Sequence, residues 1–204
     1  MQTIELYIED EDEYGVFAIS LVSEPAIESD FVALSKQTTE NKYTVKLKTV
    51  QKEKNTVVGY ALIPDIKIPR VKDGKKFNIT MSKETVAKAA RLYLQQLNQK
   101  NVTSQHEKPV KGCCVFESWI VEDPKNDKVN LYNLEPKPKG GEWVIKMILS
   151  DEEASKVQDG EYNGFSIEAM FQGFEALDLK KEPKKITDED ILNALCKIAD
   201  DEKE

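Results

Sequence analysis

The sequence predicts a β-rich α+β fold, and three observations lead to this prediction. Short runs of alternating or continuous apolar residues recur between turn residues along most of the chain. Only three segments show the helical spacing of apolar residues. With 204 residues, of which 40% are hydrophobic, the chain is long enough for one domain with its own core and small appendages.

The predicted strands of the N-terminal half are bounded by turn signals. An acidic stretch separates the first two, and Pro25 ends the second because proline cannot donate to a sheet ladder. The dipeptide Asp73-Gly74 is a typical hairpin turn between the last two. These strands cover residues 4–8, 16–22, 43–50, 56–63, 68–71 and 77–81.

The C-terminal half mixes helices and strands. Ser82 caps the clearest predicted helix, which ends near Asn98, and Ser150 opens a capping box before a short helix that stops at Gly160. His106 lies in a polar segment that is predicted to be a loop, at 101–109. The remaining predicted strands are 110–121, 143–149 and 165–171. The first of these is apolar on both faces, which predicts a central strand.

The composition shifts near the C-terminus, which predicts a boundary there. Residues 1–179 contain the predicted β-rich domain. Residues 180–204 begin with a charged linker and continue with an amphipathic helix. We therefore expect one main domain followed by a tethered helix.

The charge and the rare residues exclude several kinds of function. A net charge of −8 makes the chain a poor candidate for nonspecific binding to nucleic acid or to anionic membranes. No apolar run approaches the roughly 18–20 residues that span a bilayer. His106 is the only histidine, which excludes a histidine-rich metal site, and the three cysteines form no CxxC pair. We expect no metal, no cofactor and no disulfide framework.

Four polar residues are candidates for chemistry. A lone histidine such as His106 in a polar loop is most often a surface residue, and a serine in an apolar strand is usually structural. Strand alternation nevertheless places Ser166 and Glu168 on one face. Their segment is no G-x-S-x-G elbow, because Glu168 replaces the final glycine. Glu117 lies in an apolar strand and needs a partner if it is buried, either a lysine or the histidine that it would orient.

Several segments, taken in order, resemble the XkdF-like serine protease domain of tailed phages. They are residues 19–27, 59–65, 110–124, 141–144 and 159–169, and the resemblance covers roughly residues 15–175. This family is similar to prohead maturation proteases, whose fold resembles the herpesvirus assemblin barrel. The resemblance implies a closed or partly closed barrel with a few flanking helices. The first segment follows the serine strand in other prohead proteases, which suggests a circularly rearranged barrel here.

The resemblance also implies a catalytic pair. Ser166 would be the nucleophile, and His106, 60 residues earlier, would take its proton and return it to the leaving amine. The third member stays open between Glu168 and Glu117, with Glu24 less favoured and a Ser–His dyad as a further alternative. Glu168 has a geometric weakness, because it shares the strand of the nucleophile.

The function implied by the resemblance is that of a prohead maturation serine endopeptidase. It would act inside the procapsid in the cytoplasm of an infected bacterium, on the scaffold, on the major capsid protein and on itself. The herpesvirus relatives suggest a homodimer, and we expect no nucleic-acid or membrane partner. The alternative is a noncatalytic capsid- or scaffold-associated protein that retains the protease fold. Ser118, Cys113 and Cys114 are less favoured nucleophiles.

Overall fold

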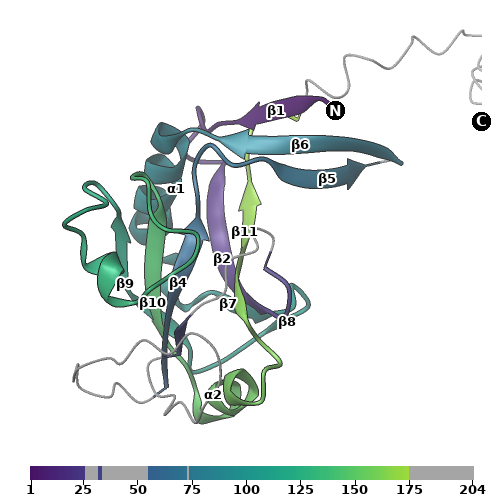
Figure 1. The fold of residues 1–204 in the computed structure, drawn as a ribbon. Coiled ribbons are helices and arrows are strands. Elements are labelled where there is room, and N and C mark those ends of the chain that lie inside the picture. The colour runs from purple at the N-terminus through teal and green to yellow at the C-terminus, as the bar shows by residue number, and fades with distance from the viewer. Residues whose placement is uncertain (26–31, 34–54, 73, 175–204) are drawn as a thin grey trace, which may run out of the picture. The chain divides into compact units, whose positions relative to one another are not determined.

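Figure 1 shows the computed structural model, which describes residues 1–25, 32–33, 55–72 and 74–174. Strands dominate these residues. The strands are β1 (Thr3–Leu6), β2 (Gly15–Val22), β3 (Val32–Ala33), β4 (Thr56–Leu62), β5 (Ile68–Lys72), β6 (Lys75–Met81), β7 (Val102–Ser104), β8 (Lys108–Pro109), β9 (Cys114–Ile120), β10 (Trp143–Ile148) and β11 (Gly164–Met170). The helices are α1 (Lys83–Gln95), α2 (Asp151–Gln158) and the 3₁₀ turns η1 (Asn98–Lys100) and η2 (Lys128–Leu131).

The strands form three sheets in the described part of the chain. Their orders are β1-β6-β5, β3-β4-β10-β9 and β11-β2-β7-β8. The α+β prediction is confirmed, and so is the predicted hairpin, because strands β5 and β6 pair antiparallel. None of the three sheets closes into a barrel among the described residues, so the barrel and its circular rearrangement stay predictions.

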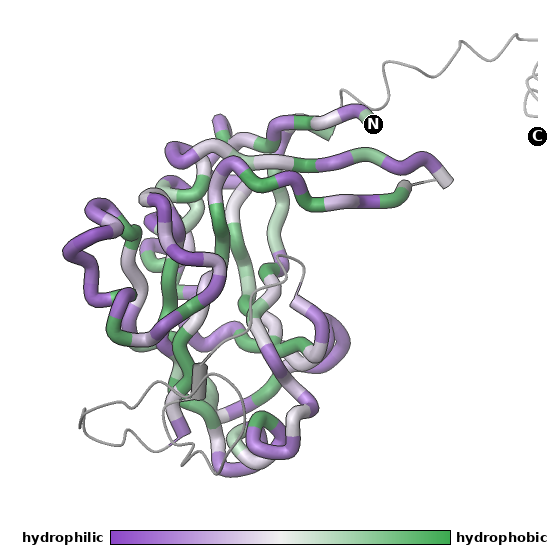
Figure 2. Tube along the Cα trace, in the orientation of Figure 1, coloured by the Kyte–Doolittle hydropathy of each residue, from purple (hydrophilic) through white to green (hydrophobic). Residues whose placement is uncertain are grey.

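One part of the core lies between α1 and the two four-stranded sheets, and another lies between β4, β10 and residues 121–134. Helix α1 packs against β2, β9 and β10, and every residue of β4 is buried. Figure 2 shows hydrophobic residues concentrated along β2, β4 and β10. Trp143 of β10 is completely buried and meets the Tyr93 ring of α1 edge-on, with 5.4 Å between ring centroids. Ser82 caps α1 as predicted, since its side chain accepts the Thr85 N–H at 3.2 Å.

Two predictions for the segment after α1 are wrong. Residues 101–109 are not a loop but contain the short strands β7 and β8, and β7 pairs parallel with β2. The strand predicted at 110–121 covers only Cys114–Ile120 and lies at the edge of its sheet, not at the centre. Part of its outer face is covered by the segment that follows, because Trp119 contacts Tyr132 and donates its indole N–H to Asp127 at 3.1 Å.

Two further predictions lie outside the described residues. They are the strand at 43–50 and the linker and helix at 180–204. Within the described part of the chain, no helix has the length and apolar character needed to cross a membrane.

Candidate functional site

Three hydroxyl residues form a row across the sheet β11-β2-β7. Ser166 of β11 lies directly opposite Ser20 of β2, and Ser20 lies opposite Thr103 of β7. Residues that face each other in neighbouring strands project from the same side of the sheet. The register therefore places all three side chains on one face, together with Glu168, two residues beyond Ser166. The predicted alternation of Ser166 and Glu168 is confirmed.

His106 lies in a tight turn between β7 and β8. Gln105 and His106 both have positive φ, at 52° and 60°, and the Glu107 N–H donates to the Ser104 carbonyl at 2.9 Å. Positive φ at both central residues is the mark of a type I′ turn, which normally contains asparagine or glycine. Holding two ordinary residues in this conformation costs about 1–2 kcal/mol each, so the surrounding structure must enforce it.

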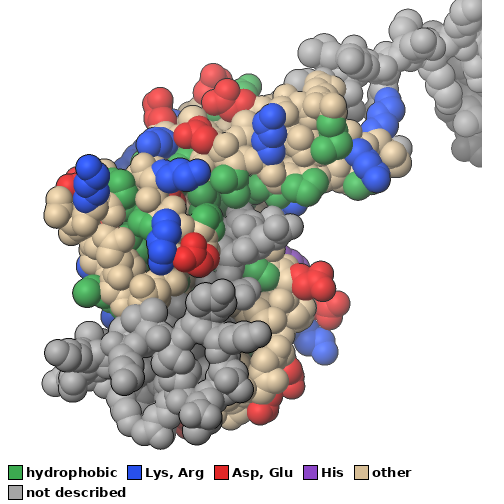
Figure 3. All heavy atoms as spheres, in the orientation of Figure 1, with side chains coloured by type: hydrophobic (Ala, Val, Ile, Leu, Met, Phe, Trp, Pro, Cys, Tyr) green, Lys and Arg blue, Asp and Glu red, His purple; other side chains and the backbone are tan. Residues whose placement is uncertain are grey.

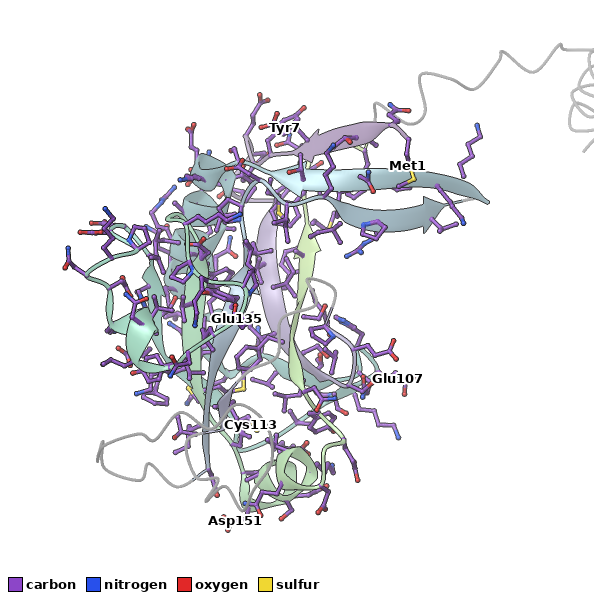
Figure 4. All side chains as sticks on the ribbon, viewed as in Figure 1. Met1, Tyr7, Glu107, Cys113, Glu135 and Asp151 are labelled. Atoms are coloured by element: carbon purple, nitrogen blue, oxygen red, sulfur yellow. The ribbon has the colours of Figure 1, made fainter. Side chains whose placement is uncertain are left out.

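Strand β2 provides that constraint. The Gln105 N–H donates to the Leu21 carbonyl at 3.0 Å, and the Gln105 side-chain oxygen accepts the Ser23 N–H at 3.3 Å. The His106 N–H donates to Ser20 Oγ at 2.9 Å. Glu107, labelled in Figure 4, is exposed at the same turn. Because the backbone of the turn is hydrogen-bonded to β2, the turn has a defined position over the sheet.

The carboxylate of Glu168 lies beside the imidazole. Glu168 Oε1 is 3.4 Å from His106 Nδ1, and the same oxygen accepts a hydrogen bond from Thr103 Oγ1. To reach His106 and Thr103, the Glu168 side chain crosses β2 above two small residues, Ala18 and Ser20. Ala18 lies opposite Glu168 in the sheet, and Ser20 lies opposite Ser166. A β-bulge interrupts the β11–β2 ladder just beyond Glu168, as is common beside active sites.

The placement of a carboxylate beside His106 Nδ1 is that of the acid–histidine pair in a serine protease. A carboxylate at Nδ1 fixes the imidazole tautomer and stabilises the imidazolium, and it leaves Nε2 for proton exchange with a nucleophile. The Ser166 backbone pairs with Ser20 in the sheet, while its partly exposed hydroxyl makes no hydrogen bond to His106 or to another described residue and so has no structural partner there. The side chains of His106 and Glu168 are 43% and 34% exposed, which makes the site accessible and its electrostatics partly screened.

The other candidate carboxylates lie in different surroundings. Glu117 is on β9, in the other four-stranded sheet, where its carboxylate pairs with Lys128 and lies 3.3 Å from Lys146 Nζ. Burial alone would raise the pKa of Glu117, but the hydrogen bonds and charges of these two lysines outweigh it and hold that pKa below its usual value. Of the two predicted partners of Glu117, a lysine or the histidine, the structure therefore shows lysines. Glu24 is exposed.

The less favoured nucleophiles have structural contacts. Ser118 Oγ accepts the indole N–H of Trp143 at 2.8 Å. Cys113 is buried, and this burial raises the pKa of its thiol, which disfavours the reactive thiolate. Cys114 Sγ is 3.5 Å from the Val115 carbonyl. Ser118 and the two cysteines lie in or next to β9, whereas His106 belongs to the other four-stranded sheet.

Two residues at the site were not predicted from the sequence. Ser20 and Thr103 contribute the hydroxyls that hold His106 and Glu168. One signal for Ser20 was present, since it is the only polar side chain in the apolar run at 16–22. Thr103 had no such signal, because it lies in a polar segment.

Surface charge and ligand geometry add two observations. On the face shown in Figure 3, acidic and basic side chains are interspersed. Among the described residues, no group of three or more His, Cys, Asp or Glu side chains is placed to hold a metal ion.

Comparison with known proteins identifies one family. Residues 44–175 match the family described as "Putative phage serine protease XkdF". The match includes β4 to β11, with His106, Glu168 and Ser166, and it begins after β2. Searches of curated proteins and of solved structures found no match.

Proposed function

The chain belongs to the XkdF family of phage serine proteases, and on this basis we propose that it is a serine endopeptidase that matures the phage prohead. Its substrates would be the scaffold and the major capsid protein, cleaved inside the procapsid. The observation that carries the proposal is the contact of Glu168 with His106 Nδ1, over the same sheet face that presents Ser166.

The proposed chemistry is acyl transfer in two steps. His106 Nε2 takes the proton of Ser166 as Oγ attacks the scissile carbonyl, and the negative carboxylate of Glu168 stabilises the imidazolium that forms. The peptide C–N bond then breaks, and His106 gives the proton to the leaving amine. Water, deprotonated by the same imidazole, releases the acyl group and regenerates the Ser166 hydroxyl.

The assemblin-like barrel is part of this proposal. Two four-stranded sheets are present, and strand β11 of one contacts strand β4 of the other. This contact supports a partly closed arrangement of the two sheets. A homodimer and self-cleavage belong to the same proposal and follow from the family resemblance alone.

Coexpression with the scaffold and capsid proteins of the same phage tests the function. We expect wild type to shorten at least one of these proteins, and Ser166→Ala and His106→Ala each to abolish the cleavage while the fold is kept. Ser118→Ala, which removes a hydroxyl from the other sheet, is the matched control and should cleave normally. If wild type leaves both proteins intact in assembling proheads, the noncatalytic structural role is favoured instead.

A further inference from the structure

We propose that Ser20, in a strand that precedes the family match, is a positioning residue that holds the catalytic histidine over the nucleophile. The inference rests on the proposed function and deepens it. Nothing in the comparison with known proteins concerns this residue, because the matched region begins at residue 44.

The catalytic histidine starts from a strand that does not neighbour the strand of the nucleophile. Neighbouring strands lie about 4.8 Å apart, so β7 and β11, which flank β2, are separated by about 10 Å. His106 follows β7, whereas Ser166 and Glu168 are on β11. The turn that carries His106 must therefore fold back over β2. The hydrogen bonds from the Gln105 N–H to the Leu21 carbonyl and from the His106 N–H to Ser20 Oγ show that it does so. The Glu168 side chain crosses β2 from the other side and lies 3.4 Å from His106 Nδ1.

The hydroxyl of Ser20 bonds only to the β7 hairpin among the described residues. Ser20 is completely buried, and a buried hydroxyl without partners is costly. Its Oγ accepts the His106 N–H at 2.9 Å and lies 3.5 Å from the Thr103 carbonyl, to which it can donate. Both bonds connect β2 to the β7 hairpin. The hydroxyl thus fixes the backbone of His106 at the point where the turn crosses the middle strand.

The backbone of His106 is strained. His106 has a φ of 60°, in the left-handed region that few non-glycine residues occupy. The hydrogen bond from its own N–H helps to maintain this conformation, together with the Gln105–Leu21 and Glu107–Ser104 backbone bonds. Without Ser20 Oγ, that N–H would have to find another acceptor, and relaxation of the turn would move the imidazole away from Glu168 and Ser166.

The single histidine makes the hydrogen bond directly measurable. Selective ¹⁵N-histidine labelling of the full chain yields one backbone amide signal, that of His106. We expect Ser20→Ala to shift this signal and to accelerate its exchange with water by about tenfold or more, as loss of a hydrogen bond worth about 1.4 kcal/mol predicts. Ser118→Ala is the matched control, because it removes another strand hydroxyl that accepts an N–H, and it should leave the His106 signal unchanged.

The catalytic consequence is measured with a fluorophosphonate, which reacts with an activated serine. Ser20→Ala should lower the maximal rate of labelling of Ser166 by about tenfold, with little change in the concentration of probe that gives half this rate. Ser118→Ala should label at the wild-type rate even if it loses similar stability to urea. Wild-type labelling rates together with an unchanged His106 amide in Ser20→Ala would overturn the positioning role and leave the proposed function intact. If wild-type Ser166 is not labelled in assembling proheads, the proposed function fails and the positioning role with it.

Discussion

The replacement Glu168→Gln isolates the charge of the carboxylate next to the histidine. The glutamine side chain has nearly the same shape, and its amide oxygen can still accept the hydrogen bond from Thr103. At the 3.4 Å that separates Glu168 Oε1 from His106 Nδ1, two unit charges interact by about 1 kcal/mol at the dielectric of water and by about 5 kcal/mol at an effective dielectric of 20. Because the two side chains are 34% and 43% exposed, solvent screening places the value near the lower limit, at about 2 kcal/mol.

Since this interaction grows when the imidazole becomes protonated in the transition state, about 2 kcal/mol corresponds to about a 30-fold loss of cleavage rate. The loss should be much smaller than the roughly 10⁴-fold effect of neutralising a buried triad aspartate. The assay is the rate at which the scaffold or capsid protein is cleaved during coexpression. Glu107→Gln removes an exposed charge from the residue that follows His106 and should retain nearly the full rate. A Glu168→Gln rate within about twofold of wild type would refute the role assigned to this carboxylate.

Two further predictions concern stability. The pKa of Glu117 is lowered from 4.5 in the folded protein. Its pairing with Lys128 and Lys146 therefore stabilises the fold fully above pH 4.5, and this stabilisation is lost progressively as the pH falls from there through the lower pKa of the folded state. Glu117→Gln should therefore lower the free energy of unfolding, measured by urea titration, by about 1–2 kcal/mol at pH 7. The difference from wild type should be smaller at pH 3, and an equal difference at both pH values would contradict this. Gly173 has a φ of 112°, and an added Cβ would lie 2.4 Å from the Glu5 carbonyl oxygen. Gly173→Ala should accordingly cost more than about 1 kcal/mol, whereas Gly160→Ala, also at positive φ but with open space around the Cβ, should cost less in the same titration.

Local patterns were sufficient to predict much of the fold. The apolar stripe and cap of α1, the Asp73-Gly74 hairpin and the alternation in β11 are properties of neighbouring residues. The β7–β8 hairpin was missed for a local reason as well. Its turn uses Gln105 and His106 in place of the glycine or asparagine that normally signal a type I′ turn.

The candidate site depended on information that no local pattern contains. Glu168 shares a strand with Ser166, which argues against its role as the residue that orients His106. The structure shows why its side chain can still reach the imidazole. It crosses β2 where both underlying residues, Ala18 and Ser20, are small. This crossing requires the register of three strands that are far apart in sequence. Likewise, nothing near Glu117 in the sequence distinguishes Lys146 from the other lysines as its partner.

The most direct test of the central claim is the position of a fluorophosphonate adduct on protein taken from assembling proheads. Trypsin cleavage after Lys156 and Lys180 releases a peptide in which Ser166 is the only serine, so mass spectrometry assigns the adduct without ambiguity. We expect an adduct on this peptide in wild type and its loss in His106→Ala, because the hydroxyl is then no longer activated. An adduct on Ser118 or another residue, or undiminished labelling of Ser166 in His106→Ala, would contradict this expectation.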